Sequence, residues 1–257
     1  MNQSPVSGAG GASKRFLILC PDYDEAALWV YEELSKTVDC ELIRSSDLDL
    51  ARRWEHRLGD RDTVEIELED GTVICGSAYR GVLNRTAAIP ACLAPYAVEP
   101  DRDYAMGEAA AFAMSWLACL PNVLNRPTPL GMSGAWRHMS DWAMLAGAAG
   151  FNVPDYRQDQ DDWSDKGQRA LVPEQSRRVS LVSFGSRIYG APLPANVEQA
   201  CLRLHQLAEV DFLGVELAYQ DASDELIFSY ATPWPDLRIG GNDLVADLAA
   251  YIDELPL

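Results

Sequence analysis

The stretch 120–156 restricts the possible folds more than any other part of the sequence. Its opening apolar run is closed by Asn125-Arg126-Pro127, a turn rich in Gly and Pro follows, and a helical pattern then ends at Gly150. In that pattern apolar residues recur three or four positions apart, which places them on one face of a helix. Ser133 is a favourable N-cap residue, and Gly147 or Gly150 can adopt the left-handed conformation that ends a helix. The stretch therefore predicts a strand, a turn and a helix packed on a core.

The sequence before this stretch alternates between strand and helix patterns. Residues 15–20 and 39–44 are short runs typical of strands, and residues 22–37 between them carry apolar side chains at helical spacing. The loop 20–24 contains no glycine, so it lacks the Gly-rich turn of a dinucleotide site. The pattern fits a doubly wound α/β domain without a dinucleotide, and residues 48–58 predict a further short helix.

Two more segments of the first half predict strands. Residues 63–75 alternate between apolar and polar side chains around Asp70-Gly71, which is typical of a hairpin. Residues 79–86 form a strand pattern that ends in Asn84 and Arg85, at the carboxyl end where ligands of open α/β sheets collect. Arg85 therefore has two readings of equal weight, a binding role or an ion pair with nearby acids on an acidic protein.

The remaining elements are predicted from periodicity. Residues 104–120 are apolar nearly all round, which indicates a buried helix. Residues 179–191 and 211–232 each predict a hairpin, and helical patterns follow them at 197–208 and 243–255. The expected fold class is α/β, changing to α+β in the C-terminal half.

Charge and composition exclude several classes of protein. The formal net charge of −18, from 21 basic and 39 acidic residues, argues against non-specific binding to nucleic acid or to anionic membranes. No window has the apolar length of a membrane span. The first 13 residues are Gly/Ser-rich without a signal-peptide pattern, which predicts a disordered tail and a cytoplasmic protein. Six cysteines without a Cys-X-X-Cys pair and three scattered histidines predict no metal site.

Three motifs resemble the ATP-grasp ligases, in the branch that joins amino acids or peptides through a carboxylate. They are Gly150-Phe-Asn-Val-Pro, the Arg178-Val-Ser-Leu-Val-Ser-Phe-Gly strand and Leu213-Gly-Val-Glu216. The resemblance implies a truncated ATP-grasp-like fold. It places a doubly wound-type α/β domain at 14–120, of the kind that precedes the ATP-grasp domain, and an ATP-grasp-like domain at 121–257.

The chain departs from the family in the parts that hold Mg²⁺ and triphosphate. The lid would have to fit between Pro154 and Val179, although four strands with turns need on the order of forty residues. Lys166 is the only lysine after position 36. The family's last strand ends Glu-X-Asn, and Ser229 and Ala231, taken here as the matching positions, cannot ligate magnesium. Glu216 stands at the place of the family's remaining acid.

The resemblance and its gaps lead to one expectation and one alternative. We expect a non-catalytic protein, without a cofactor, that binds a peptide, a small molecule or a partner enzyme in a biosynthetic pathway. The alternative is an ATP-dependent carboxylate–amine ligase that uses ATP and Mg²⁺ and is completed by a partner subunit. A hydrolase is disfavoured because no Gly-X-Ser-X-Gly motif occurs. A homodimer is left open. The candidate ligand-binding residues are Asn84, Arg85, Asn125, Arg126, Arg187, Glu216 and Asp236.

Overall fold

The computed structural model describes residues 14–57, 59, 63–87, 98–155, 172, 176–220 and 225–256. The expected disordered tail, residues 1–13, lies outside them. So do residues 156–171 and 173–175, which make up most of the stretch between Pro154 and Val179. Within the described ranges, no helix has the length and apolar character needed to cross a bilayer.

The first half of the chain builds a parallel sheet of four strands. β1 (Arg15–Cys20) is central, and α1 (Glu25–Leu34) connects it to β2 (Cys40–Arg44) on one side. β6 (Tyr79–Asn84) pairs with its other side and is followed by β7 (Val123–Leu124), giving the order β2-β1-β6-β7. The direction of sheet growth reverses between β1 and β6. The predicted doubly wound α/β arrangement is therefore confirmed, and its crevice lies at the carboxyl ends of these two strands.

A small antiparallel sheet follows β2. After α2 (Ser45–Asp49), the strands are β3 (Arg53–Arg57), β4 (Thr63–Glu67) and β5 (Val73–Cys75), in that order. A short 3₁₀ turn, Gly76–Ala78, leads to β6. The hairpin predicted at 63–75 is confirmed.

The helix predicted at 48–58 is wrong, because α2 ends at Asp49 and residues 53–57 form β3. In the β3–β4 ladder Trp54 stands opposite Ile66, and its ring lies 5.0 Å from that of Phe112. The pairing with β4 therefore decides the local conformation, a cross-strand contact that helical spacing does not reveal.

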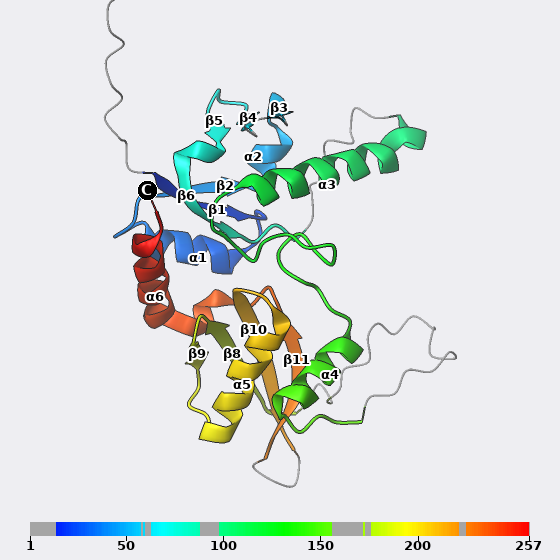
Figure 1. The fold of residues 1–257 in the computed structure, drawn as a ribbon, viewed down its shortest axis with the longest axis vertical. Helices are drawn as coiled ribbons and strands as arrows, with labels where there is room; N and C mark the ends of the chain where they lie inside the picture. Colours follow the sequence, from blue (N-terminus) through cyan, green and yellow to red (C-terminus); the bar gives the residue numbers. More distant parts are fainter. Residues whose placement is uncertain are drawn as a thin grey trace, which may run out of the picture.

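The apolar helix α3 (Arg102–Cys119) is only half covered. A 3₁₀ turn, Glu99–Asp101, leads into it. Its fully buried residues, Ala113, Trp116 and Leu117, lie in the C-terminal half, whereas Tyr104 near the start is 72% exposed. Figure 1 shows the first turns projecting away from the rest of the protein. The prediction of a buried helix is thus wrong for these turns, because an all-round apolar composition does not specify how much of a helix finds a partner.

The helix predicted within 120–156 is present but starts later than expected. α4 (Met139–Ala149) has His138 as its N-cap, whose side chain accepts a hydrogen bond from the Ser140 amide. The prediction of Ser133 as N-cap is wrong, since its buried hydroxyl donates to the Asn84 carbonyl at 2.7 Å. Gly150 ends the helix with φ = 99°, as predicted.

The second half forms an antiparallel sheet in the order β11-β10-β8-β9. Its elements are β8 (Arg178–Phe184), β9 (Arg187–Gly190), α5 (Ala195–Ala208), β10 (Phe212–Tyr219) and β11 (Leu226–Thr232). Both predicted hairpins and the helix between them are confirmed. α4 and α5 pack on one face of this sheet, with Trp142, Leu204 and Leu217 among the shared core residues.

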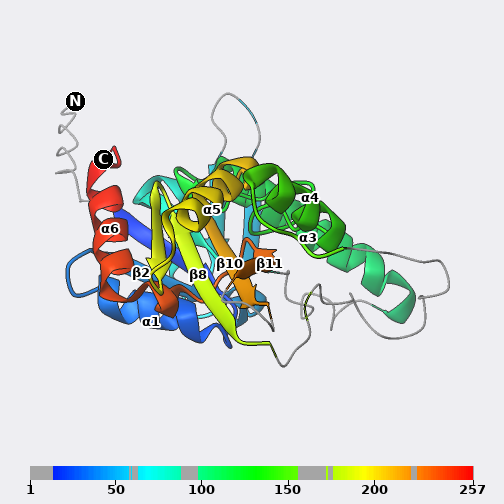
Figure 2. The same cartoon turned by 90° about the horizontal axis from the view of Figure 1, so that it is seen from below.

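The chain ends against the first half. After a 3₁₀ turn, Leu237–Gly240, α6 (Gly241–Glu254) packs beside α1, as Figures 1 and 2 show. One hydrophobic core contains Phe16 of β1, Val182 of β8 and Leu248 of α6. The two sheets are therefore joined by shared core residues rather than by a linker alone.

Candidate functional site

A pocket of about 300 Å³ opens at the carboxyl ends of β1 and β6. It lies at the crevice where open α/β sheets bind ligands. Three segments line it: the loop after β1 with the start of α1, the residue that follows β6, and the chain after β11. The lining residues are Tyr23, Asp24, Glu25, Ala26, Arg85, Trp234, Pro235, Asp236 and Arg238.

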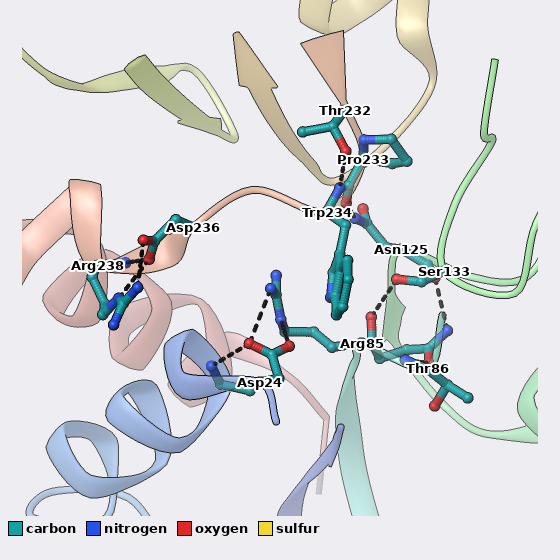
Figure 3. A network of polar contacts seen from close by, with 12 residues as sticks. Asp24, Arg85, Thr86, Asn125, Ser133, Thr232, Pro233, Trp234, Asp236 and Arg238 are labelled. Atoms are coloured by element: carbon teal, nitrogen blue, oxygen red, sulfur yellow. Dashed lines mark hydrogen bonds and ion pairs between the residues drawn. The ribbon is translucent and has the colours of Figure 1, made fainter. Parts of the chain in front are cut away.

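Arg85 is held inside the pocket wall by a buried carboxylate. Its Nε lies 2.5 Å from Asp24 Oδ2 and its Nη2 lies 3.3 Å from Asp24 Oδ1. Both residues are 5% exposed. Asp24 also caps α1 by accepting from the Ala27 amide, and the indole of Trp234 points toward the guanidinium, whose carbon lies 5.2 Å from the ring centroid (Figure 3). Arg85 therefore forms an ion pair with a nearby acid, which was one of the two roles expected for it.

The mouth of the pocket carries acids and an exposed aromatic ring. Arg238 lies 2.8 Å from Asp236 Oδ2 and 2.8 Å from Glu25 Oε2. Its hydrogen bonds hold the pKa of Asp236 below the ordinary value. Tyr23 is 73% exposed and stands edge-on to Trp234, with 6.3 Å between the ring centroids. This arrangement offers acceptor oxygens beside an aromatic surface.

Asn84 and Asn125 lie beneath this pocket and use their side chains inside the fold. Asn84 Nδ2 donates to the carbonyls of Asn125 and Met132. Asn125 has φ = 54°; its Nδ2 donates to the Pro233 carbonyl at 2.5 Å, and its Oδ1 accepts from the Phe212 amide at 2.9 Å. These amides connect the end of the first sheet to the second, as Figure 3 shows for Asn125.

The other three candidate residues lie elsewhere. Arg126 donates to the Ala118 and Leu120 carbonyls at the end of α3, at 2.6 and 3.2 Å. Arg187 pairs with Asp247 on α6, and Glu216 lies on β10. Of the seven candidates, Arg85 and Asp236 line this pocket.

The lining residues that were not among the sequence candidates include Tyr23, Asp24, Trp234 and Arg238. The first two lie in the loop after β1, whose place at a strand's carboxyl end could have indicated them. Nothing in the sequence pattern pointed to Trp234 or Arg238, which reach the pocket only because α6 returns the chain to the first sheet.

The residues around Glu216 do not fit a magnesium-bridged triphosphate. Its carboxylate accepts hydrogen bonds from Arg178 and, at 3.0 Å, from the hydroxyl of Ser229. Its neighbours across the sheet are Ser180 and Tyr230. Mg²⁺ favours an octahedron of oxygens that includes carboxylates, and within the described residues no group of three or more His, Cys, Asp or Glu could hold a metal.

The strand register corrects which residues replace the family's Glu-X-Asn. Ala231 stands opposite Val215 and is fully buried against α4, on the other face of the sheet from Glu216. Tyr230 and Thr232 share the face of Glu216, and Ser229, at the bulge that shifts the register, also turns its hydroxyl to the Glu216 carboxylate. The assignment of Ala231 as one of the two matching residues is therefore wrong, whereas Ser229 does contact Glu216.

The register predicts different outcomes for two double variants. Tyr230→Glu with Thr232→Asn is expected to fold and to give no ATP turnover, because Arg178 still holds Glu216. Ser229→Glu with Ala231→Asn is expected to lose stability, since burying the amide of Asn costs about 1–3 kcal/mol. Phosphate release and thermal melting of both variants check this. Wild-type stability of the second variant would contradict the register, and ATP turnover by the first would contradict the role assigned to Arg178.

The comparison with known proteins comes from structure alone, since no protein-family model and no curated protein sequence matches this chain. A ribosomally synthesised peptide (RiPP)-associated ATP-grasp ligase of Chryseobacterium gregarium, solved with ADP and a leader and core peptide, is 15% identical with a TM-score of 0.66. The alignment covers 95% of this chain and 98% of the ligase.

Two further solved structures are similar. The macrocyclase MdnC of Microcystis aeruginosa MRC, bound to its precursor peptide MdnA, is 12% identical with a TM-score of 0.71 over 93% of this chain and 99% of MdnC. The ATP-grasp ligase PsnB, solved with a minimal precursor, Mg and ADP, is 13% identical with a TM-score of 0.64 over 93% and 97%. Likeness at this level of identity concerns the fold. The chain thus resembles the ATP-grasp ligases in its fold, as its motifs predicted.

Proposed function

We propose that this chain is a non-catalytic ATP-grasp-like protein that binds a peptide in a biosynthetic pathway. The observation that carries the proposal is the state of Glu216, whose carboxylate is bonded to Arg178 and Ser229. A guanidinium thus occupies the place at which an ATP-grasp ligase would use its acid for Mg²⁺. In this proposal residues 14–120 and 121–257 are the two domains, and a second copy or a partner enzyme is a further binding partner.

The chemistry of a ligase explains why this observation matters. Transfer of a γ-phosphoryl group is catalysed mainly by preorganised cations around the phosphoryl oxygens. Arg178 supplies a positive charge near the site, but its bond to Glu216 offsets that charge, and Oε1 of the carboxylate is already bonded to Arg178 and Ser229. Lys36 does not add a cation to this site: it lies far from this sheet in sequence, and its ammonium group pairs with Glu33 at 2.6 Å.

Peptide binding is supported by the pocket at β1 and β6 and by the similar structures. The ligase of Chryseobacterium gregarium, MdnC and PsnB were each solved with a peptide or precursor. In this chain Tyr23 offers an exposed ring at the mouth, beside Asp236, whose carboxylate also bonds Arg238. A peptide supplies N–H donors for such oxygens and side chains that pack on an exposed ring.

Calorimetry with ATP, in the presence and absence of Mg²⁺, tests the loss of catalysis. We expect no magnesium-dependent binding and no phosphate release, and the matched variant Glu216→Gln should behave like the wild type. Magnesium-dependent binding that is lost in Glu216→Gln would overturn the proposal. It would favour a ligase completed by another subunit.

Selection from a displayed peptide library tests the binding role with the same protein. Selected peptides should bind the wild type and lose affinity for Tyr23→Ala, since the Tyr23 ring is exposed and its removal leaves the core intact. Asp253→Asn, which changes an exposed acid of α6 outside the pocket, is the control. Absence of any selected peptide, or equal binding to Tyr23→Ala, would contradict peptide binding at this pocket.

A further inference from the structure

A cysteine, a histidine and a serine meet where the small antiparallel sheet packs against α3. His56 lies on β3, and Ser115 and Cys119 lie four residues apart on α3, so they share one face of the helix. Nε2 of His56 lies 3.7 Å from Cys119 Sγ, and its Nδ1 lies 3.3 Å from Ser115 Oγ. None of the three residues lines the pocket at β1 and β6. This group is therefore separate from the proposed peptide site.

The imidazole of His56 is held in place by its packing. In the β3–β4 ladder His56 stands opposite Val64, whose side chain belongs to the same core as α3. The imidazole also meets the ring of Phe112 edge to face, with 5.9 Å between the centroids. A ring with a bond at each nitrogen and an aromatic neighbour keeps Nε2 directed at the sulfur.

The two partners of the imidazole suit both ends of a proton transfer. In the neutral ring with an unprotonated Nε2, that nitrogen accepts from the thiol, and Nδ1–H donates to the hydroxyl oxygen of Ser115. After the transfer both ring nitrogens are donors, and the thiolate and the hydroxyl oxygen are both acceptors. An imidazolium beside a thiolate stabilises the anion, which is the reactive form of cysteine. The geometry therefore allows His56 to act as the base for Cys119.

A positive charge covers the end of α3 at which this thiol lies. The C-terminus of a helix carries a partial negative charge, which by itself disfavours a thiolate. Here Arg126 donates to the carbonyls of Ala118 and Leu120, the residues on either side of Cys119. Its guanidinium thus offsets the charge of the helix end at this position. Cys119 is also exposed, and reactive thiols lie in partly exposed, positively charged surroundings of this kind.

The other described cysteines have different surroundings. Burial raises the pKa of Cys20, Cys40 and Cys201 to about 12, which keeps these thiols protonated near neutral pH. Cys75 Sγ lies 3.1 Å from the hydroxyl of Ser77, which is not a base near neutral pH. Among the cysteines that the structure describes, Cys119 is thus the one shown bonded to an imidazole.

We propose that Cys119 is a reactive thiol that forms mixed disulfides with small disulfide compounds. His56 Nε2 takes the thiol proton, and the sulfur of Cys119 attacks one sulfur of the compound. A new S–S bond forms while the S–S bond of the compound breaks, and the leaving thiolate takes the proton from the imidazolium. The disulfide compound is the oxidant, and one half of it is released as a thiol.

Reaction of the full chain with 2-hydroxyethyl disulfide, followed by mass spectrometry of the cysteine-containing peptides, tests the proposal. The compound is uncharged, so the net charge of −18 neither attracts nor repels it. A pairing that raises the thiolate fraction about a hundredfold should speed the attack only about tenfold, because a more acidic thiol is a weaker nucleophile. We expect Cys119 to react roughly tenfold faster than Cys75 in the same sample. Equal rates at these two cysteines would overturn the proposal.

Variants identify the base. His56→Gln removes the imidazole and should bring the rate at Cys119 close to that at Cys75. Ser115→Ala removes the partner of Nδ1 and should slow Cys119 by a smaller factor. Alanine is a good helix former, so this variant decides the question if His56→Gln fails to fold.

The matched control is Ser77→Ala, which removes the hydroxyl beside Cys75 and should leave the rate at Cys119 unchanged. The rate at Cys75 should stay constant in His56→Gln and Ser115→Ala, which shows that the fold is kept. An unchanged rate at Cys119 in folded His56→Gln or in Ser115→Ala would overturn the role of His56. A change of equal size at Cys75 would show a general effect on the structure and would overturn it as well.

Discussion

Replacing Arg85 with alanine is expected to lower the free energy of unfolding by about 3–5 kcal/mol. The reason is that Asp24 would remain buried with its charge uncompensated after losing both bonds to the guanidinium. The stacking of the guanidinium against Trp234 would be lost as well. Urea or thermal unfolding monitored by tryptophan fluorescence measures the change.

The matched control for this prediction is Arg238→Ala, in the same pocket. Arg238 pairs with Asp236 and Glu25 at the surface, so its removal should leave the melting temperature close to that of the wild type. The double variant Asp24→Asn with Arg85→Met should recover part of the loss, because no buried charge is left unpaired. Wild-type melting of Arg85→Ala would show that Asp24 does not need its partner.

A smaller loss of stability is expected for Arg126 than for Arg85. Arg126 is exposed and bonds to carbonyl groups at the end of α3. Arg126→Ala should therefore cost less than Arg85→Ala.

Asn125→Ala is expected to cost on the order of 4 kcal/mol of unfolding free energy, because several buried hydrogen bonds are lost together. Its Oδ1 accepts from the amides of Asp211 and Phe212, and its Nδ2 donates to the carbonyls of Phe212 and Pro233. Alanine would leave these groups of the second sheet and its exit turn without their partner. Chemical denaturation, with the two halves compared by hydrogen exchange, measures the effect.

Asn125→Gly separates the side-chain bonds from the backbone conformation. Asn125 has φ = 54°, a left-handed value that alanine adopts at a cost of about 1–2 kcal/mol and that glycine adopts freely. Glycine should therefore lose less than alanine, while both lose the bonds between the sheets. If Asn125→Gly has wild-type stability, the side chain of Asn125 does not hold the two sheets together.

The order and type of most elements followed from the sequence, because they depend on local periodicity. The alternating residues of 63–75 and of the two C-terminal hairpins each place one apolar face, and such a face has few ways to be buried. Gly150 ended its helix as predicted, since the left-handed conformation is available to glycine at little cost. The motifs that resemble the ATP-grasp family supplied the topology that periodicity alone leaves open.

Only the tertiary structure decided the parts that depend on contacts between distant residues. Trp54 lies in a strand because its segment pairs with β4. The hydroxyl of Ser133 donates to the Asn84 carbonyl and does not cap α4. A bulge at Ser229 put Tyr230 beside Glu216 and Ala231 on the opposite face of the sheet. Asp24 lies 61 positions before Arg85 in the chain, and nothing local indicates that the fold buries the two as a pair. Periodicity in the sequence shows which side of a helix or strand is apolar. The hydrogen-bond partner of a polar group is fixed only later, when the packed elements exclude water and leave that group a single partner.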